Sequence, residues 1–232
     1  MNESGTTPLT SLDELIRQHC YPEWRQMLRE KNQRITFAKG QAIFSTGQKA
    51  SHMYMVQSGR VKVVADLGKG ASRLIRLAGK GEVLGHRGIG DEPSYTASAF
   101  ALGPVEMNVI PMPLFLSTLK ANNLFCYHFL LYFAEEMRQL DQHLRDLMNL
   151  DVGGRVVKVL LLCRATFGMD GEDPRKLAFT LPRKDIASMA DTTYESVVRT
   201  LAALKQQGLI DLVGKEVRLR KPKVLEKMVE GD

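Results

Sequence analysis

The sequence predicts an α+β protein built from a β-rich N-terminal half, a long central helix and a helical C-terminal domain. Three patterns indicate this fold class: short apolar runs broken by glycine between residues 34 and 111, an uninterrupted helical pattern from about Leu114 to Leu150, and two short helical segments between Arg183 and Gln207. Since 232 residues exceed a typical single core, more than one domain is expected.

Residues 1–32 are predicted to form a helical packing segment. From Ser11 to about Lys31, apolar residues recur at steps of three and four, a spacing typical of short amphipathic helices. They are Leu12, Leu15, Ile16, Trp24, Met27 and Leu28.

Residues 33–113 are predicted to form a β domain. Short apolar runs alternate there with glycine turns such as Lys39-Gly40, Ser58-Gly59 and Gly103-Pro104. Many short strands separated by glycine turns indicate a sandwich or barrel. The expected strands contain residues 43–44, 53–56, 61–64, 74–77 and 105–110.

Residues 114–150 are predicted to form one dimerisation helix. Its seam follows steps of four and three, which is the pattern of a two-stranded coil. The alternative is an amphipathic helix lying on its own β domain, as we also expect of its aromatic first half. Polar residues that include Glu135, Glu136 and Asp146 fit the flanks of such a coil, and Gly153-Gly154 predicts a hinge after it. The seam contains Cys126, and its expected interface residues are Leu130, Phe133, Met137, Leu140, Leu144 and Leu147.

Residues 151–232 are predicted to form a winged helix-turn-helix domain. Two short helices joined by a tight turn are typical of this motif, whose second helix enters the major groove of DNA. Thr192 followed by Glu195 has the spacing of a capping box at the start of that helix. A hairpin over residues 209–220 would form the wing. Val197, Leu201 and Leu204 should face the core.

The opposite face of the second helix is predicted to contact bases through Tyr194, Glu195, Val198 and Arg199. Arginine can pair with guanine and glutamate can accept from cytosine, so Glu195 and Arg199 are the main candidates. A backbone-capping Glu195, and an Arg199 that contacts phosphate or forms a salt bridge, are the simpler alternatives. By position, the expected phosphate contacts are Arg183, Thr193, Ser196, Lys215, Arg218 and Arg220.

The excess positive charge lies in this C-terminal region. Between Arg175 and Lys223 there are 11 Lys and Arg residues against 5 Asp and Glu, and the rest of the chain has 21 of each. A localised basic region suits a polyanion such as double-stranded DNA, although charge alone fits a solvated surface equally well.

Other functional classes find little support in the sequence. Cys20, Cys126 and Cys163 are too far apart for a CxxC motif, so we expect neither a disulfide framework nor a metal site. The chain has no Walker, HExxH or GxSxG motif, hence no expected catalytic residue. It also lacks a secretory signal pattern and a long apolar run, so we expect a cytoplasmic protein without membrane partners.

The order of these parts resembles the cyclic-AMP receptor protein/FNR family of bacterial transcription regulators over nearly the whole chain. Residues 39–47 and 53–63 resemble the family's first strands, and residues 183–187 with 195–199 resemble its DNA-reading signature. The resemblance implies an N-terminal β-roll sensor domain of the cyclic-nucleotide-binding type, a homodimer, base contacts by Glu195 and Arg199, and RNA polymerase as a partner. Tyr194 stands where the cyclic-AMP receptor has arginine, so the DNA site is expected to differ.

The effector region departs from that family. The nucleotide-binding form has a Gly-Glu pair for the ribose and an Arg-Ser-Ala for the cyclic phosphate, and neither charged residue is present here. Control by cyclic AMP is therefore doubtful. Arg87 could hold another anion or face solvent. The expected pocket residues are Gly85, His86, Arg87, Gly88, Tyr95 and Thr96.

Three alternatives to a cyclic-nucleotide sensor can be compared. His86 is a candidate axial ligand for a haem, although an isolated histidine is more often simply packed or exposed. Cys20 alone cannot hold an iron–sulfur cluster. The third alternative is a binding or scaffold protein of this fold that has no effector.

Overall fold

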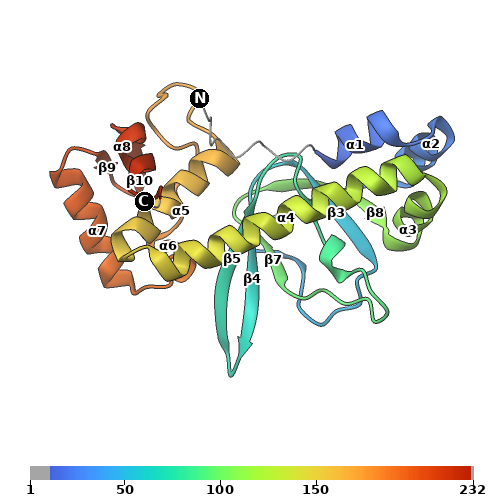
Figure 1. The fold of residues 1–232 in the computed structure, drawn as a ribbon, viewed down its shortest axis with the longest axis horizontal. Helices are drawn as coiled ribbons and strands as arrows, with labels where there is room; N and C mark the ends of the chain where they lie inside the picture. Colours follow the sequence, from blue (N-terminus) through green and yellow to red (C-terminus); the bar gives the residue numbers. More distant parts are fainter. Residues whose placement is uncertain (1–10, 231–232) are drawn as a thin grey trace.

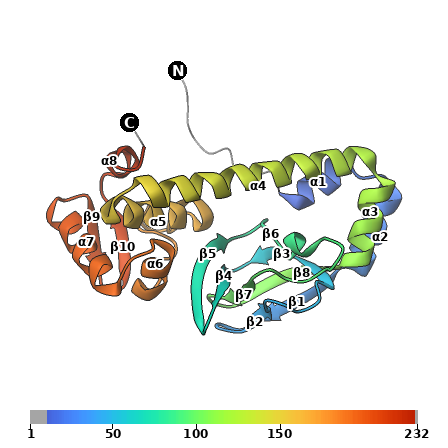
Figure 2. The same cartoon turned by 60° about the horizontal axis from the view of Figure 1, so that its bottom comes forward.

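The computed structural model describes residues 11–230, so the first ten residues of the predicted N-terminal segment lie outside the described part. A β domain lies beneath one long helix, α4 (Asn123–Asn149), and a helical domain is attached at the far end of that helix (Figures 1 and 2). Helices and strands are combined as the predicted α+β fold class requires. The described helices include none with the length and apolar character needed to cross a membrane.

The β domain consists of two antiparallel four-stranded sheets. Their orders are β1-β8-β3-β6 and β2-β7-β4-β5. Strands β1, β6 and β7 were not expected from the sequence. The N-terminal helices α1 (Leu12–His19) and α2 (Pro22–Lys31) pack at its end near α3 (Met112–Ala121). The strands are β1 (Gln33–Phe37), β2 (Ala42–Phe44), β3 (His52–Ser58), β4 (Val61–Gly68), β5 (Ala71–Ala78), β6 (Val83–Leu84), β7 (Ser98–Ala101) and β8 (Val105–Pro111).

The helical stretch predicted as one helix from residue 114 is in fact two helices, α3 and α4, separated at Asn122. The buried Asn122 side chain donates to the Thr118 carbonyl oxygen at 2.8 Å and accepts from the Tyr21 amide at 2.7 Å. The Asn122 side chain thus bonds to the last turn of α3 and to the amide of Tyr21, the residue before α2, at the point where α3 ends and the chain changes direction.

Helix α4 lies on its own β domain through a stripe of large side chains. Phe125, Phe129 and Tyr132 are buried in the β-domain core, and Glu136 and Asp146 are buried farther along the same helix. The prediction that Glu136 and Asp146 flank a coiled coil in solvent is therefore wrong. Both carboxylates face this chain because cationic side chains of the β domain and of α5 meet them.

The predicted glycine hinge is also wrong. Helix α5 (Val152–Phe167) already begins before Gly153 and Gly154, and both glycines lie in its first turn. The Asp151 carboxylate caps that turn by accepting from the Gly154 amide at 2.7 Å. The chain instead changes direction at Leu150 and Asp151, because a capping carboxylate favours helix initiation over a flexible link.

The C-terminal domain surrounds α5 with two short helices, α6 (Arg183–Met189) and α7 (Tyr194–Gln206), and a hairpin. Strands β9 (Ile210–Val213) and β10 (Glu216–Leu219) form the predicted hairpin around Gly214, whose φ of 59° fits a tight turn. The last helix is α8 (Pro222–Lys227), which packs on α5.

The two domains pack directly on each other. Leu74 and Leu77 of β5 belong to the same apolar core as Ile186 of α6. The Leu74 amide donates to the Ser188 hydroxyl at 2.9 Å, and Lys62 of β4 pairs with Asp185 at 2.8 Å. The first helix of the helix-turn-helix is thus fixed to the β domain.

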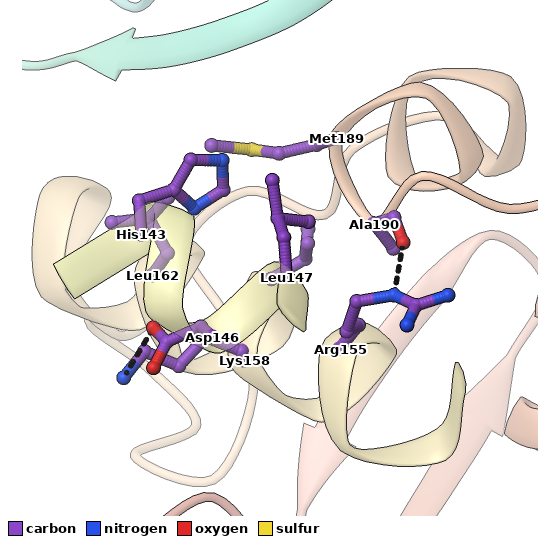
Figure 3. Close-up of a pocket in the computed structure, with 9 residues that line it drawn as sticks. His143, Asp146, Leu147, Arg155, Lys158, Leu162, Met189 and Ala190 are labelled. Carbon is purple, nitrogen blue, oxygen red and sulfur yellow. Dashed lines mark hydrogen bonds and ion pairs between the residues drawn. The ribbon is translucent and has the colours of Figure 1, made fainter. Parts of the chain in front are cut away.

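A small cavity of about 20 Å³ lies where α4, α5 and α6 meet, between His143, Leu147 and Met189 (Figure 3). Beside it, Arg155 donates to the carbonyl oxygen of Ala190 at 2.8 Å and to that of Leu150 at 2.9 Å. One guanidinium therefore ties the end of α4 to the turn after α6.

Candidate nucleic-acid interface and ligand pocket

Helix α7 begins one residue later than a capping box at Thr192 would require. Its N-cap is Thr193, whose hydroxyl accepts from the Ser196 amide at 3.2 Å. The preceding Asp191 has a left-handed φ of 50°, which makes the turn after α6 longer. The predicted capping box of Thr192 and Glu195 is therefore wrong, and among residues 11–230 Glu195 makes no hydrogen bond to the backbone of the kind that its alternative role required.

The two faces of α7 separate as the periodicity predicted. Val197, Leu201 and Leu204 are buried in the C-terminal core. The four residues predicted to read bases lie together on the exposed face. They are Tyr194, Glu195, Val198 and Arg199.

Arg199 is exposed and its guanidinium contacts Ser196 at 3.3 Å, one helical turn earlier. Neither Arg199 nor Glu195 takes part in a salt bridge among the described residues. The internal salt bridge considered for Arg199 is thus not formed. An exposed arginine and an exposed glutamate on one helical face can both donate to and accept from base edges.

The residues predicted to contact phosphate differ in their surroundings. Lys215 is exposed at the tip of the hairpin, and Arg183 at the start of α6 donates to its carbonyl oxygen at 3.3 Å. Thr193 and Ser196 lie at the N-terminal turn of α7.

Two arginines of the wing are already paired. Arg218 lies 3.0 Å from Asp173 and Arg220 lies 3.4 Å from Asp211. Their charges are therefore partly neutralised within the chain, unlike that of Lys215.

A second site lies in the β domain, where one cavity of about 50 Å³ is lined by all six predicted pocket residues, Gly85, His86, Arg87, Gly88, Tyr95 and Thr96. The short 3₁₀ turn His86–Gly88 forms its polar wall. Glycine is required at two positions, because a Cβ at Gly88 would lie 2.5 Å from Ala50 and one at Gly85 would lie 2.9 Å from the His52 carbonyl oxygen.

The basic side chains of this cavity, two arginines and one neutral histidine, converge on Glu136 of α4. Arg76 lies 2.9 Å from one carboxylate oxygen, while His86 and Arg87 lie 2.5 Å and 3.5 Å from the other. The Tyr132 hydroxyl donates to the same carboxylate at 3.3 Å. Arg76 also pairs with Glu82 at 3.4 Å.

These contacts determine the charge states. Burial by itself would raise the pKa of Glu136, but the hydrogen bond from His86 and the charges of Arg76 and Arg87 outweigh it and lower the pKa to about 2. Burial lowers the pKa of His86, so His86 is a neutral donor through Nε2 at pH 7. Within residues 11–230, His86 Nδ1 is a buried atom without a hydrogen-bond partner.

The cavity does not fit a haem. The Nε2 atom of His86 is bonded to Glu136, and the ring is only 1% exposed. The space beside it, about 50 Å³, is far below the several hundred Å³ typical of sites for drug-sized ligands. The residues present thus argue against His86 as an axial ligand.

Arg76, Glu82 and Glu136 were not identified from the sequence as pocket residues. Steps of four and three place Glu136 on the same face of α4 as Phe125, Phe129 and Tyr132, but spacing alone does not show that the β domain covers this face. Lys205 of α7 was also not predicted as part of the exposed face. It is exposed, and helical spacing places it on the same side as Tyr194 and Val198.

Two family models match the chain. Residues 34–122 match the cyclic nucleotide-binding domain, and residues 154–228 match the Crp-like helix-turn-helix domain. The chain is 27% identical over 202 residues to a protein of Mycobacterium tuberculosis described as a CRP-like cAMP-activated global transcriptional regulator, covering 87% of this chain and 90% of that one. It is 28% identical over 200 residues to a cyclic AMP receptor protein of Thermus thermophilus, covering 86% and 89%.

Solved structures share the fold. FixK2 from Bradyrhizobium japonicum superposes with a TM-score of 0.77 at 20% identity, covering 87% of this chain and 98% of that one. TTHB099, a CRP-family transcriptional regulator from Thermus thermophilus, gives a TM-score of 0.70 at 21% identity, covering 85% and 97%.

Proposed function

The chain belongs to the cyclic-AMP receptor protein/FNR family of bacterial transcription regulators, and we propose that it binds a near-palindromic DNA site as a homodimer. The observation that carries the proposal is the exposed face of α7, with Glu195 and Arg199 free of salt bridges in the described chain. The role is regulation by binding in the cytoplasm, with RNA polymerase as a further partner, and not catalysis.

We propose that Tyr194, Glu195, Val198 and Arg199 read bases in the major groove. Arg183, Thr193, Ser196 and Lys215 would contact phosphates around them, because they surround the N-terminal turn of α7 and the tip of the wing. We assign Arg218 to fixing the wing, since it pairs with Asp173.

We assign one role to each of the predicted domains. Residues 1–32 would support the β domain, residues 33–113 would form the sensor, residues 114–150 would form the dimer contact and residues 151–232 would bind DNA. A two-fold axis along α4 would place the two α7 helices about one helical turn of DNA apart, ~34 Å.

The dimer contact is proposed for the exposed apolar residues of α4. Leu130, Leu140 and Leu144 are 63%, 38% and 51% exposed, although each is large and apolar. Phe133, Met137 and Leu147 of the same seam are half-buried. Such a stripe on a surface helix is typical of a helix that pairs with another.

The test of DNA reading is selection of bound duplexes from a random library, followed by salt titration on the selected site. We expect Arg199→Ala to lower the affinity for that site by about 10- to 100-fold, while affinity for random DNA and the dimer remain unchanged. Arg34→Ala, which removes an exposed arginine of the β domain that pairs with Glu106, is the matched control. Unchanged discrimination in the Arg199 variant would contradict the assigned role.

A further inference from the structure

The three basic side chains that line the β-domain pocket are all directed at Glu136. Arg76, His86 and Arg87 line the cavity, and all three lie within 3.5 Å of the Glu136 carboxylate. That carboxylate belongs to α4, which passes over the β domain (Figure 2). Glu136 is 3% exposed, so these contacts take place away from bulk water.

The arginines of this cluster face carboxyl groups of the same chain. Arg76 lies 3.4 Å from Glu82 and 2.9 Å from Glu136, and Arg87 lies 3.5 Å from Glu136. A free anion entering the cavity would meet basic side chains that already face Glu136, although Arg87 Nε, 3.5 Å from that carboxylate, has no hydrogen-bond partner among residues 11–230. Because the Glu136 carboxylate is tethered, it also competes at a high effective concentration against any anion in solution.

We propose that Glu136 is a built-in anionic ligand whose carboxylate occupies the cationic part of the pocket, so that the protein binds DNA without a free anionic effector. The inference rests on the proposed function in one respect, because it assumes that this cavity is the family's effector pocket. It implies that neither a cyclic nucleotide nor inorganic phosphate binds there in the wild-type protein.

The position of Glu136 connects the pocket to the DNA-binding domain. Ten residues farther along α4, Asp146 pairs with Lys158 of α5 at 3.0 Å (Figure 3). The same helix thus carries one carboxylate into the sensor domain and another onto the DNA-binding domain. The contacts of Glu136 therefore fix the position of α4 on the sensor domain and on the DNA-binding domain.

Chemical rescue provides the test. In the full-length protein, Glu136→Ala removes the carboxylate and leaves space beside Arg76, His86 and Arg87, so we expect its thermal midpoint to fall by about 10 °C. Acetate at about 100 mM should restore much of this loss in a saturable way, compared with chloride at the same ionic strength. The control is Glu135→Ala, since Glu135 pairs only with Arg138 on the surface of the same helix.

Glu136→Gln fills the same volume without the negative charge, so it should be destabilised like Glu136→Ala but, having no vacant space, should not be rescued by acetate. If Glu136→Ala does not fold in chloride, refolding in acetate alone supports the proposal, and failure in both salts overturns it. Equal stabilisation of wild type and variants by the same anions would also overturn it. The duplex selection uses wild-type protein without added acetate or phosphate, and its result does not depend on the rescue experiment. A failed rescue can therefore be distinguished from a failed DNA-binding role.

Discussion

Single buried residues give this protein a defined response to acid. The pKa of His86 is lowered by burial from 6.5, and that of Glu136 is lowered from 4.5 to about 2 by its hydrogen bond and ion pairs, against the opposing effect of burial. Both groups therefore bind fewer protons folded than unfolded. Their stabilising contributions are complete above the unfolded pKa values and are lost as the pH falls below about 6.5 and then below about 4.5. Burial raises the pKa of Glu82, so this group binds more protons in the folded protein, and its effect on stability as the pH falls is opposite to that of His86 and Glu136.

We expect the free energy of unfolding, measured by denaturant titration, to fall as the pH is lowered from 7 to 5.5. Replacing His86 with glutamine should reduce that slope by up to about 1 kcal/mol per pH unit, because one proton uptake on unfolding is removed. The exposed-surface variant Arg34→Ala should retain the wild-type slope. Identical slopes in wild type and the His86 variant would show that another group carries the acid response.

At the scale of elements, α4 has two different apolar stripes. Phe125, Phe129 and Tyr132 are covered by this chain, whereas Leu130 and Leu144 are exposed. Periodicity alone predicted an apolar helix and a seam, but steps of four and three fit both stripes. The covered stripe could only be assigned once the β domain was in place beneath it.

We expect Leu144→Asp to dissociate the proposed homodimer. A charge placed in an apolar seam costs about 2 kcal/mol per protomer, hence about 4 kcal/mol per dimer, which is roughly a 1000-fold rise in Kd. Sedimentation at micromolar protein would measure the change. Leu67→Asp, at the 63% exposed end of β4, is the control that adds the same charge away from the seam. A monomeric wild type with DNA present would rule out the dimer altogether.

At the scale of the whole molecule, the first helix of the helix-turn-helix is anchored to the sensor. Lys62 holds both carboxylate oxygens of Asp185, at 2.8 and 3.0 Å, and the pair is only partly exposed. Arg60 lies over the ring of Phe179 at 5.1 Å and donates to the Ala178 carbonyl oxygen. These contacts cross between the domains, so movement of the DNA-binding domain has to break them.

Removing the ion pair should loosen this domain contact without unfolding either domain. For Lys62→Met we expect a local loss of about 1 kcal/mol, since the pair is partly solvated, and hence roughly fivefold faster hydrogen exchange at the Leu74 amide. The Leu74 amide is a suitable probe because it donates to Ser188 across the contact. Arg34→Met removes an exposed pair within the β domain and should leave that exchange rate unchanged.

Features that depend on near neighbours along the chain could be predicted without the fold. Glycine turns separated most of the strands, and spacing alone placed Val197, Leu201 and Leu204 on the buried side of α7. The reading face with Glu195 and Arg199 followed from the same spacing. Local capping was less certain, because moving the N-cap from Thr192 to Thr193 depended on the left-handed turn at Asp191.

The pairing of buried charges, in contrast, depends on contacts between residues far apart along the chain. His86 and Glu136 are 50 residues apart in sequence, yet they form a direct hydrogen bond in the core. Periodicity placed Glu136 on α4 but could not say which face of that helix the β domain covers. A buried charge is stable only beside its partner, so the partner of Arg76, His86 and Arg87 was fixed when α4 packed on the sheets.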